Sequence, residues 1–241
     1  YVDEPDTISF GTPDGAEGGA LILKPVSRPG FVTPTGRVTD FVSGRINTRG
    51  KFDATYGRIA ARIKMPDAAG VWPAFWMLGY GQWPDAGEID IMEAVNLGVP
   101  CETCKGGTEN HILGTLHYGD LWPNNEHNSK ETELDGAYDE FHNYAAEWSA
   151  GKITWLIDDV PFATQTADDW HSAADRAQGR PFAPFDQRFH LILNLAIGGG
   201  LPEGRNEGGV SKDGFPKTME VDWVRVYECS KDPLNGTGCE K

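Results

Sequence analysis

The residues best able to do chemistry lie in one short acidic run, Gly87-Glu88-Ile89-Asp90-Ile91-Met92-Glu93. In a regular β-strand successive side chains point to opposite faces, so Glu88 and Asp90 share one face and the isoleucines share the other. Strict alternation would turn Glu93 to the isoleucine side, where an unpaired carboxylate is costly. One extra residue at Met92, a β-bulge, returns Glu93 to the face of Glu88 and Asp90. The run therefore predicts three carboxylates converging on one face of a strand.

Three converging carboxylates suit the hydrolysis of a glycosidic bond. A retaining mechanism needs a carboxylate nucleophile and a carboxylic acid about 5–5.5 Å apart across the sugar. Neighbouring anions raise the pKa of the acid and keep it protonated at neutral pH. Two other interpretations use the same residues, namely a calcium site built from carboxylate oxygens and an exposed acidic edge.

Aromatic residues flank the acidic run. The segment 72–78 and Trp83 precede it, and a segment from His117 to Trp122 follows it. Sugar rings present apolar faces that stack on aromatic side chains, while their hydroxyls need polar partners. Trp83 and Trp122 lie beside proline or glycine in expected loops, which makes them candidates for a sugar cleft. Three further tryptophans are expected in the core: Trp76, Trp155 and Trp223.

The elements that must position these residues show a period of two. In 57–65, for example, Ile59, Ala61 and Ile63 share one face, and basic residues take the other. Strands are predicted near 19–25, 41–49, 57–65, 72–79, 87–95, 111–118, 141–148, 152–158, 189–197 and 218–227. Only 168–178 has a helical pattern. Many strands with turn signals between them predict an all-β sandwich, jelly roll or barrel, with one domain over 1–228 and a short polar C-terminal tail over 229–241.

Composition narrows the classes of partner. The 241 residues include 36 acidic and 21 basic ones, which gives a net charge of −15. This charge disfavours nucleic acid, anionic membranes and sulfated polymers, whereas a neutral substrate would not be repelled. No window approaches the roughly 20 apolar residues that a bilayer span needs. A signal peptide is expected to be lacking or already removed.

The four cysteines fall in two local pairs, Cys101 with Cys104 and Cys229 with Cys239. Glycine and proline around the first pair indicate a loop rather than the helix start of a redox motif. Two structural disulfides are favoured, with a four-cysteine zinc site or free thiols as the alternatives. Disulfides would place the protein outside the cytosol, so we expect a secreted, extracellular protein.

The run from Gly87 to Glu93 resembles the active-site signature of glycoside hydrolase family 16, in the form with the extra residue found in laminarinases. Flanking segments resemble laminarinase strands in the same order: 43–52, 56–58, 72–78, 189–197 and 221–227. The resemblance implies a β-jelly-roll of two curved antiparallel sheets with a concave substrate cleft. It also implies Glu88 as nucleophile, Glu93 as general acid/base, and Asp90 as a hydrogen-bond partner of the nucleophile.

The resemblance extends to residues around the catalytic pair. Trp83 and His117 match positions that line the adjacent sugar subsites, and three more residues are expected to contribute: Asn47, Arg58 and Trp122. Arg45 and Arg62 share strand parity with the cleft face. Many members bind structural calcium on the convex face through an aspartate like Asp222 and backbone carbonyls of the N-terminal strands.

Two departures from the family pattern carry consequences. The usual first segment, Trp-x-Asp-Glu-Phe, is not found here, so either processing removed it or one sheet closes differently. Its loss puts the completeness of the calcium site in question. Leu201 stands where laminarinases often carry a tryptophan, which removes a stacking platform at one end of the cleft.

These features together predict a monomeric, extracellular endo-β-1,3-glucanase that hydrolyses laminarin-type β-glucans with retention and requires no organic cofactor. Its tolerance of mixed β-1,3-1,4 linkages is left open. The rival interpretations are a non-catalytic β-glucan-binding domain of the same fold, an enzyme of this fold acting on agarose or another galactan, and a jelly-roll lectin with a structural metal. A non-catalytic domain would be expected to lose the catalytic glutamates, and both are present.

Overall fold

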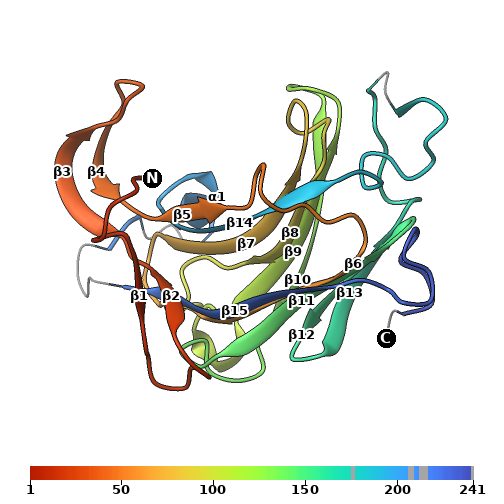
Figure 1. The fold of residues 1–241 in the computed structure, drawn as a ribbon. Coiled ribbons are helices and arrows are strands. Elements are labelled where there is room, and N and C mark those ends of the chain that lie inside the picture. The colour runs from red at the N-terminus through yellow and green to blue at the C-terminus, as the bar shows by residue number, and fades with distance from the viewer. Residues whose placement is uncertain (175–176, 206–208, 212–216, 240–241) are drawn as a thin grey trace.

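The computed structural model describes residues 1–174, 177–205, 209–211 and 217–239, which form two packed antiparallel sheets and a separate hairpin (Figure 1). The seven-stranded sheet has, in order, β1 (Ile8–Gly11), β2 (Ala20–Leu23), β15 (Met219–Tyr227), β6 (Gly57–Lys64), β11 (His142–Ser149), β12 (Lys152–Ile157) and β13 (Val160–Thr166). The six-stranded sheet has β10 (Asn125–Glu133), β9 (His111–Gly119), β8 (Glu88–Glu93), β7 (Val71–Gly79), β14 (Phe189–Ile197) and β5 (Arg45–Asn47). The hairpin pairs β3 (Val26–Val32) with β4 (Val38–Val42). The predicted all-β jelly-roll fold is confirmed.

Alternating side chains hold the two sheets together. In β6, Ile59 and Ile63 are completely buried between the sheets, while Arg58 and Arg62 point outward and form ion pairs. The core also contains large side chains from both sheets: Phe75, Tyr144, Trp148, Trp155 and Phe189. Each large apolar side chain removed from water contributes about 1.5–3 kcal/mol, so the inner faces of the two sheets drive their packing.

A β-bulge interrupts β8 at the predicted place. Asp90 pairs with Trp76 of β7, but the next pair along β7 joins Phe75 to Met92, so β8 carries one extra residue. Ile91 and Met92 are both fully buried. Glu93 then returns to the face of Glu88 and Asp90, opposite the core.

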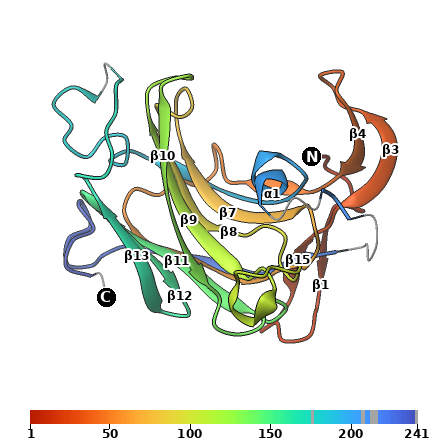
Figure 2. The same cartoon turned by 180° about the vertical axis from the view of Figure 1, so that it is seen from behind.

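The open face of the six-stranded sheet is flanked on two sides. Figure 1 shows the β3–β4 hairpin rising at one end of this sheet, next to the N-terminus, and the ends of β9 and β10 rising toward the other. Figure 2 shows the same arrangement from behind, with the short helix α1 (Gly200–Gly204) beside the open face. A second short helix, η1 (Lys105–Gly107), lies in the connection from β8 to β9.

The prediction of a helix over 168–178 is wrong for 168–174, which form turns and a β-bridge. Residues 175–176 of this segment lie outside the described part of the chain. The carboxylate of Asp169 instead caps a turn by accepting hydrogen bonds from Thr166. Trp170 packs edge-on against Phe185 at 5.0 Å between ring centroids, and Ser172 forms a β-bridge with Gly119. The helices found in the described residues are too short and polar to cross a membrane.

Candidate active site

Three carboxylates meet in one pocket on the open face of the six-stranded sheet. Glu88, Asp90 and Glu93 project there from β8 because of the bulge. The pocket has a volume of about 210 Å³ and is completed by side chains of β5, β7 and β14 and by the N-terminal residue: Tyr1, Arg45, Trp72, Ala74, Trp76, Asn194 and Ala196. The pocket thus combines three acidic side chains with aromatic and polar ones, the composition expected of a site for a polar ligand with apolar faces.

Burial governs the protonation of the three carboxyl groups. Asp90 is 2% and Glu93 8% exposed. Burial, followed by the charge of Asp90, raises the pKa of Glu88 well above its usual range. Burial and the charge of Glu93 do the same to the pKa of Asp90, and burial raises the pKa of Glu93. Because like charges in a low-dielectric site cannot all ionise, the cluster retains protons at a pH where free carboxyl groups have lost them.

Each glutamate has its own indole donor. Trp83 Nε1 donates a hydrogen bond of 2.6 Å to Glu88 Oε2, and Trp72 Nε1 donates one of 2.9 Å to Glu93 Oε1. The hydroxyl of Thr115 lies 3.5 Å from Glu93 Oε2. The two carboxyl groups are therefore fixed by separate partners on separate segments.

His117 of β9 completes the cluster. Its Nε2 lies 3.3 Å from Asp90 Oδ2 and 4.0 Å from Glu88 Oε1. The imidazole also lies 5.7 Å from the ring of Trp83 and 5.6 Å from that of His127, measured between centroids. The structure thus brings together the predicted residues Trp83 and His117 with the three carboxylates.

A family model described as glycosyl hydrolases family 16 matches residues 30–225 of the sequence. The chain belongs to glycoside hydrolase family 16. It is 37% identical over 205 residues to glucan endo-1,3-beta-glucosidase A1 of Niallia circulans, an alignment that covers 82% of this chain and 28% of the relative. It is 37% identical over 225 residues to a beta-glucanase of Rhodothermus marinus, covering 87% of this chain and 68% of the relative.

A solved structure supports the same family. A family 16 protein of a Bacteroides ovatus mixed-linkage glucan locus, in complex with a G4G4G3G product, has a TM-score of 0.70 and is 30% identical. The match covers 93% of this chain and 86% of that one. By contrast, this family 16 chain spans only a little over a quarter of the length of its Niallia relative.

Arg58 does not lie at the site of this family 16 chain. It belongs to β6 in the seven-stranded sheet, on the outer face, where it pairs with Glu147 at 3.0 Å and with Asp159. Strand parity separates the two faces of one sheet but does not say which sheet a strand joins. The prediction that Arg58 lines the cleft is therefore wrong.

Two other predicted residues lie outside the catalytic pocket. Asn47 is exposed on β5, on the same strand as Arg45, and accepts a hydrogen bond from the backbone of Arg49. Trp122 is 80% exposed in the connection between β9 and β10. Their role in substrate binding stays a prediction.

Trp76, which the sequence predicts in the core, lines the pocket instead. Its Nε1 donates to Asn194 Oδ1 at 2.8 Å, and the guanidinium of Arg45 lies 4.7 Å from its ring. Trp72 and Trp76 occupy alternate positions of β7 opposite the acidic strand, so the spacing of the two tryptophans was the signal that could have identified them. Of the other tryptophans expected in the core, Trp155 is completely buried.

Asp222 lies on β15, and its carboxylate already accepts hydrogen bonds from protein groups. It accepts 3.1 Å hydrogen bonds from the backbone N–H of Glu17 and a 2.6 Å bond from Arg62 Nη1. The same Nη1 donates to the carbonyl of Gly15 at 2.9 Å. The aspartate and a nearby N-terminal carbonyl thus face a guanidinium, so in this arrangement they do not fit a calcium ion.

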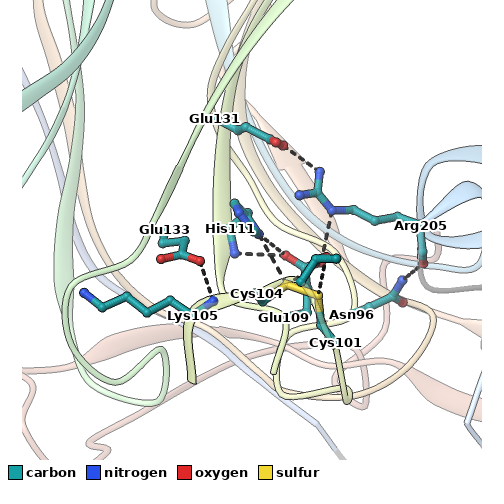
Figure 3. The surroundings of a disulfide bond; sticks show 10 residues. Asn96, Cys101, Cys104, Lys105, Glu109, His111, Glu131, Glu133 and Arg205 are labelled. Atoms are coloured by element: carbon teal, nitrogen blue, oxygen red, sulfur yellow. Dashed lines mark hydrogen bonds and ion pairs between the residues drawn. A yellow bond between two sulfur atoms is a disulfide. The ribbon is translucent and has the colours of Figure 1, made fainter. Parts of the chain in front are cut away.

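Both predicted disulfides form, Cys101–Cys104 and Cys229–Cys239. Figure 3 shows the first one beside the buried carboxylate of Glu109. Glu109 accepts a 3.1 Å hydrogen bond from Arg205, whose guanidinium also pairs with Glu131 of β10 at 2.8 Å. This network ties the disulfide loop, β10 and the residue after α1 together.

Proposed function

We propose that this chain is a retaining endo-β-1,3-glucanase acting on laminarin-type β-glucans. The observation that carries the proposal is the bulged strand β8, which places two separately anchored glutamates and Asp90 in one pocket with aromatic walls. The names of the Niallia and Rhodothermus relatives, a glucan endo-1,3-beta-glucosidase and a beta-glucanase, support the substrate class. The mixed-linkage product bound by the Bacteroides protein supports a test of β-1,3-1,4-glucans as well.

In the first step, the carboxylate of Glu88 attacks the anomeric carbon while Glu93 gives its proton to the departing glycosidic oxygen. The bond to the leaving sugar breaks as the bond to Glu88 forms. In the second step, Glu93 takes a proton from water, whose oxygen displaces Glu88 from the anomeric carbon. No organic cofactor enters either step.

The proposed mechanism requires Glu93 to serve first as an acid and then as a base. While Glu88 is ionised for its attack, a proton held on Glu93 relieves the repulsion between these two groups. Once Glu88 is bonded to the sugar, its charge is gone and the pKa of Glu93 falls. The hydrogen bond from Trp72 then favours the ionised form that activates water.

The rival of a non-catalytic β-glucan-binding domain is not favoured, because both glutamates are present and each accepts an indole hydrogen bond. Action on carrageenan is disfavoured by the net charge of −15. A neutral galactan such as agarose would not be repelled and therefore belongs in the test.

Incubation with laminarin, lichenan, agarose and carrageenan, with products resolved over time, tests the proposal. We expect a spread of laminari-oligosaccharides from laminarin early in the reaction, and none from the Glu88→Gln variant. The lichenan sample sets the linkage tolerance. Binding of laminarin without any released product would instead support the non-catalytic interpretation.

We also propose an extracellular location for this chain. Two disulfides in a chain of 241 residues support it, because such bonds persist in oxidising compartments. Detection of the mature chain in culture medium rather than in cell lysate would test this location. A monomeric state remains a prediction, which sedimentation at several protein concentrations would check.

A further inference from the structure

A second pocket adjoins the catalytic one. It has a volume of about 240 Å³ and is lined by the β3–β4 hairpin, the segment after it, and the end of β14: Thr33, Arg37, Thr39, Phe41, Val42, Ser43, Ala196 and Ile197, together with Tyr1. Tyr1 and Ala196 line both pockets. The two spaces are therefore neighbours along one open face.

The hairpin presents one defined face to this second pocket. Arg37, Thr39 and Phe41 are alternate residues and all line it, whereas Val38 and Asp40 between them do not. The turn is closed by hydrogen bonds from the backbone N–H of Thr33 to the carbonyl of Arg37 and from the N–H of Arg37 to the hydroxyl of Thr33. Figure 1 shows this hairpin standing at the end of the six-stranded sheet.

Aromatic and arginine side chains, which bind sugars by stacking and by hydrogen bonds, extend from the first pocket to the second. The guanidinium of Arg45 lies 4.7 Å from the ring of Trp76, in the catalytic pocket, and 5.7 Å from the ring of Tyr1, which lines both. Phe41 and Arg37 of the hairpin line the second pocket together with Tyr1. Aromatic rings and guanidinium donors gathered along one face match the apolar faces and hydroxyl groups of a glycan chain.

We propose that the β3–β4 hairpin forms a distal glucosyl-binding subsite for the same glucan chain that is cleaved at β8. Arg37 donates hydrogen bonds to sugar hydroxyls there, and Tyr1 separates this subsite from the catalytic pocket. The ligand is a neutral β-glucan long enough to reach from the carboxylates past Tyr1 to Arg37. This inference rests on the proposed glucanase function.

The test measures kcat/KM for laminari-oligosaccharides of increasing length with wild type, Arg37→Ala and Val38→Ala. Long substrates that reach the hairpin are expected to lose about 10- to 100-fold in kcat/KM in Arg37→Ala, the effect of one hydrogen bond to a charged group. Short substrates that end before the hairpin are expected to react as in wild type. Val38→Ala, the matched control on the opposite face of the same strand, is expected to change neither.

An equal loss at every substrate length, or no loss at any, would overturn the subsite. Failure of the glucanase function gives a different result, because wild type would then cleave none of the oligosaccharides. Calorimetric titration of the longest oligosaccharide into Glu88→Gln, with and without Arg37→Ala, tests the subsite without turnover. Equal affinities of these two variants would refute a role for Arg37 in binding.

Discussion

Trp72 allows the acid/base glutamate to be perturbed without altering a carboxyl group. Burial raises the pKa of Glu93, and the hydrogen bond from Trp72 Nε1 to Glu93 Oε1, at 2.9 Å, opposes that rise by stabilising the ionised form. Gly199 packs so close to this indole that a Cβ there would lie 3.3 Å from Cζ3. Trp72→Phe keeps an aromatic ring in this space and removes the N–H donor, together with part of the volume of the indole.

The expected shift follows from the strength of the lost bond. Hydrogen bonds to charged groups contribute about 1.5–3 kcal/mol, and one pKa unit corresponds to about 1.4 kcal/mol. Water entering the open pocket replaces part of the loss, so we expect the pKa of Glu93 to rise by about one unit. The other groups that face Glu93 are unchanged by the substitution: Asp90, His117 and Thr115.

The assay is the pH profile of kcat/KM on laminarin. Glu93 must be protonated to release the leaving group, so its pKa sets the basic limb, which moves to higher pH in Trp72→Phe. The acid limb, set by ionisation of Glu88, stays in place. Trp76→Phe is the matched control, because its indole donates to the amide of Asn194 and not to a carboxylate. A basic limb within about 0.3 unit of wild type, in a folded Trp72→Phe variant, would refute the reasoning.

Three further predictions concern the carboxylate cluster and Asp222 of the seven-stranded sheet. In Glu93→Ala, added azide is expected to restore part of the activity on a substrate with a good leaving group, since azide needs no base; no restoration would count against the acid/base role. Glu93→Gln is expected to raise the Tm at neutral pH but not at a pH below about 4. The pKa of Glu93 is raised in the folded protein, so the native state binds this proton more tightly than the unfolded chain does. The stability of wild type therefore falls as the pH rises above the unfolded pKa of about 4.3, and the glutamine variant lacks this loss. Thermal unfolding at both pH values checks this. Because Arg62 already contacts Asp222 and the Gly15 carbonyl, EDTA or added calcium is expected to shift the Tm by less than about 2 °C.

The sequence predicted the bulged strand because two requirements conflicted within seven residues. Alternation placed Glu93 in the core, and the cost of an unpaired buried carboxylate argued against that position. The strand pairing resolves the conflict as expected, with an extra residue between the partners of Phe75 and Trp76. A local energetic contradiction of this kind is informative because few backbone arrangements remove it.

Other elements carried no such signal. β10 (Asn125–Glu133) is an edge strand whose residues are all polar, and none of them is fully buried. Alternation cannot appear in a strand without an apolar face. The segment 168–178 has helical spacing, but the burial of Trp170 against Phe185 and the bridge of Ser172 to Gly119 outweigh it.

Assigning residues to a sheet needs more than strand parity. Arg58 and Arg45 both have the parity of a polar face, yet Arg58 lies on the outer face of the seven-stranded sheet and Arg45 lines the catalytic pocket. Which sheet a strand joins depends on pairings between segments far apart in the chain, such as Arg45 with Asn194. Long-range pairing of this kind is invisible to a pattern that spans a few residues.

The catalytic strand also depends on a side chain from the other sheet. Trp155 of β12 donates its indole N–H to the backbone carbonyl of Asp90 at 2.8 Å, next to the bulge where the regular strand pairing is interrupted. The indole reaches this carbonyl only because β9 has Gly114 there, where a Cβ would lie 2.5 Å from Trp155 Cδ1. A buried carbonyl without a partner is costly. The core of the sandwich thus supplies a hydrogen bond to the backbone carbonyl of Asp90, the residue that carries the central carboxylate.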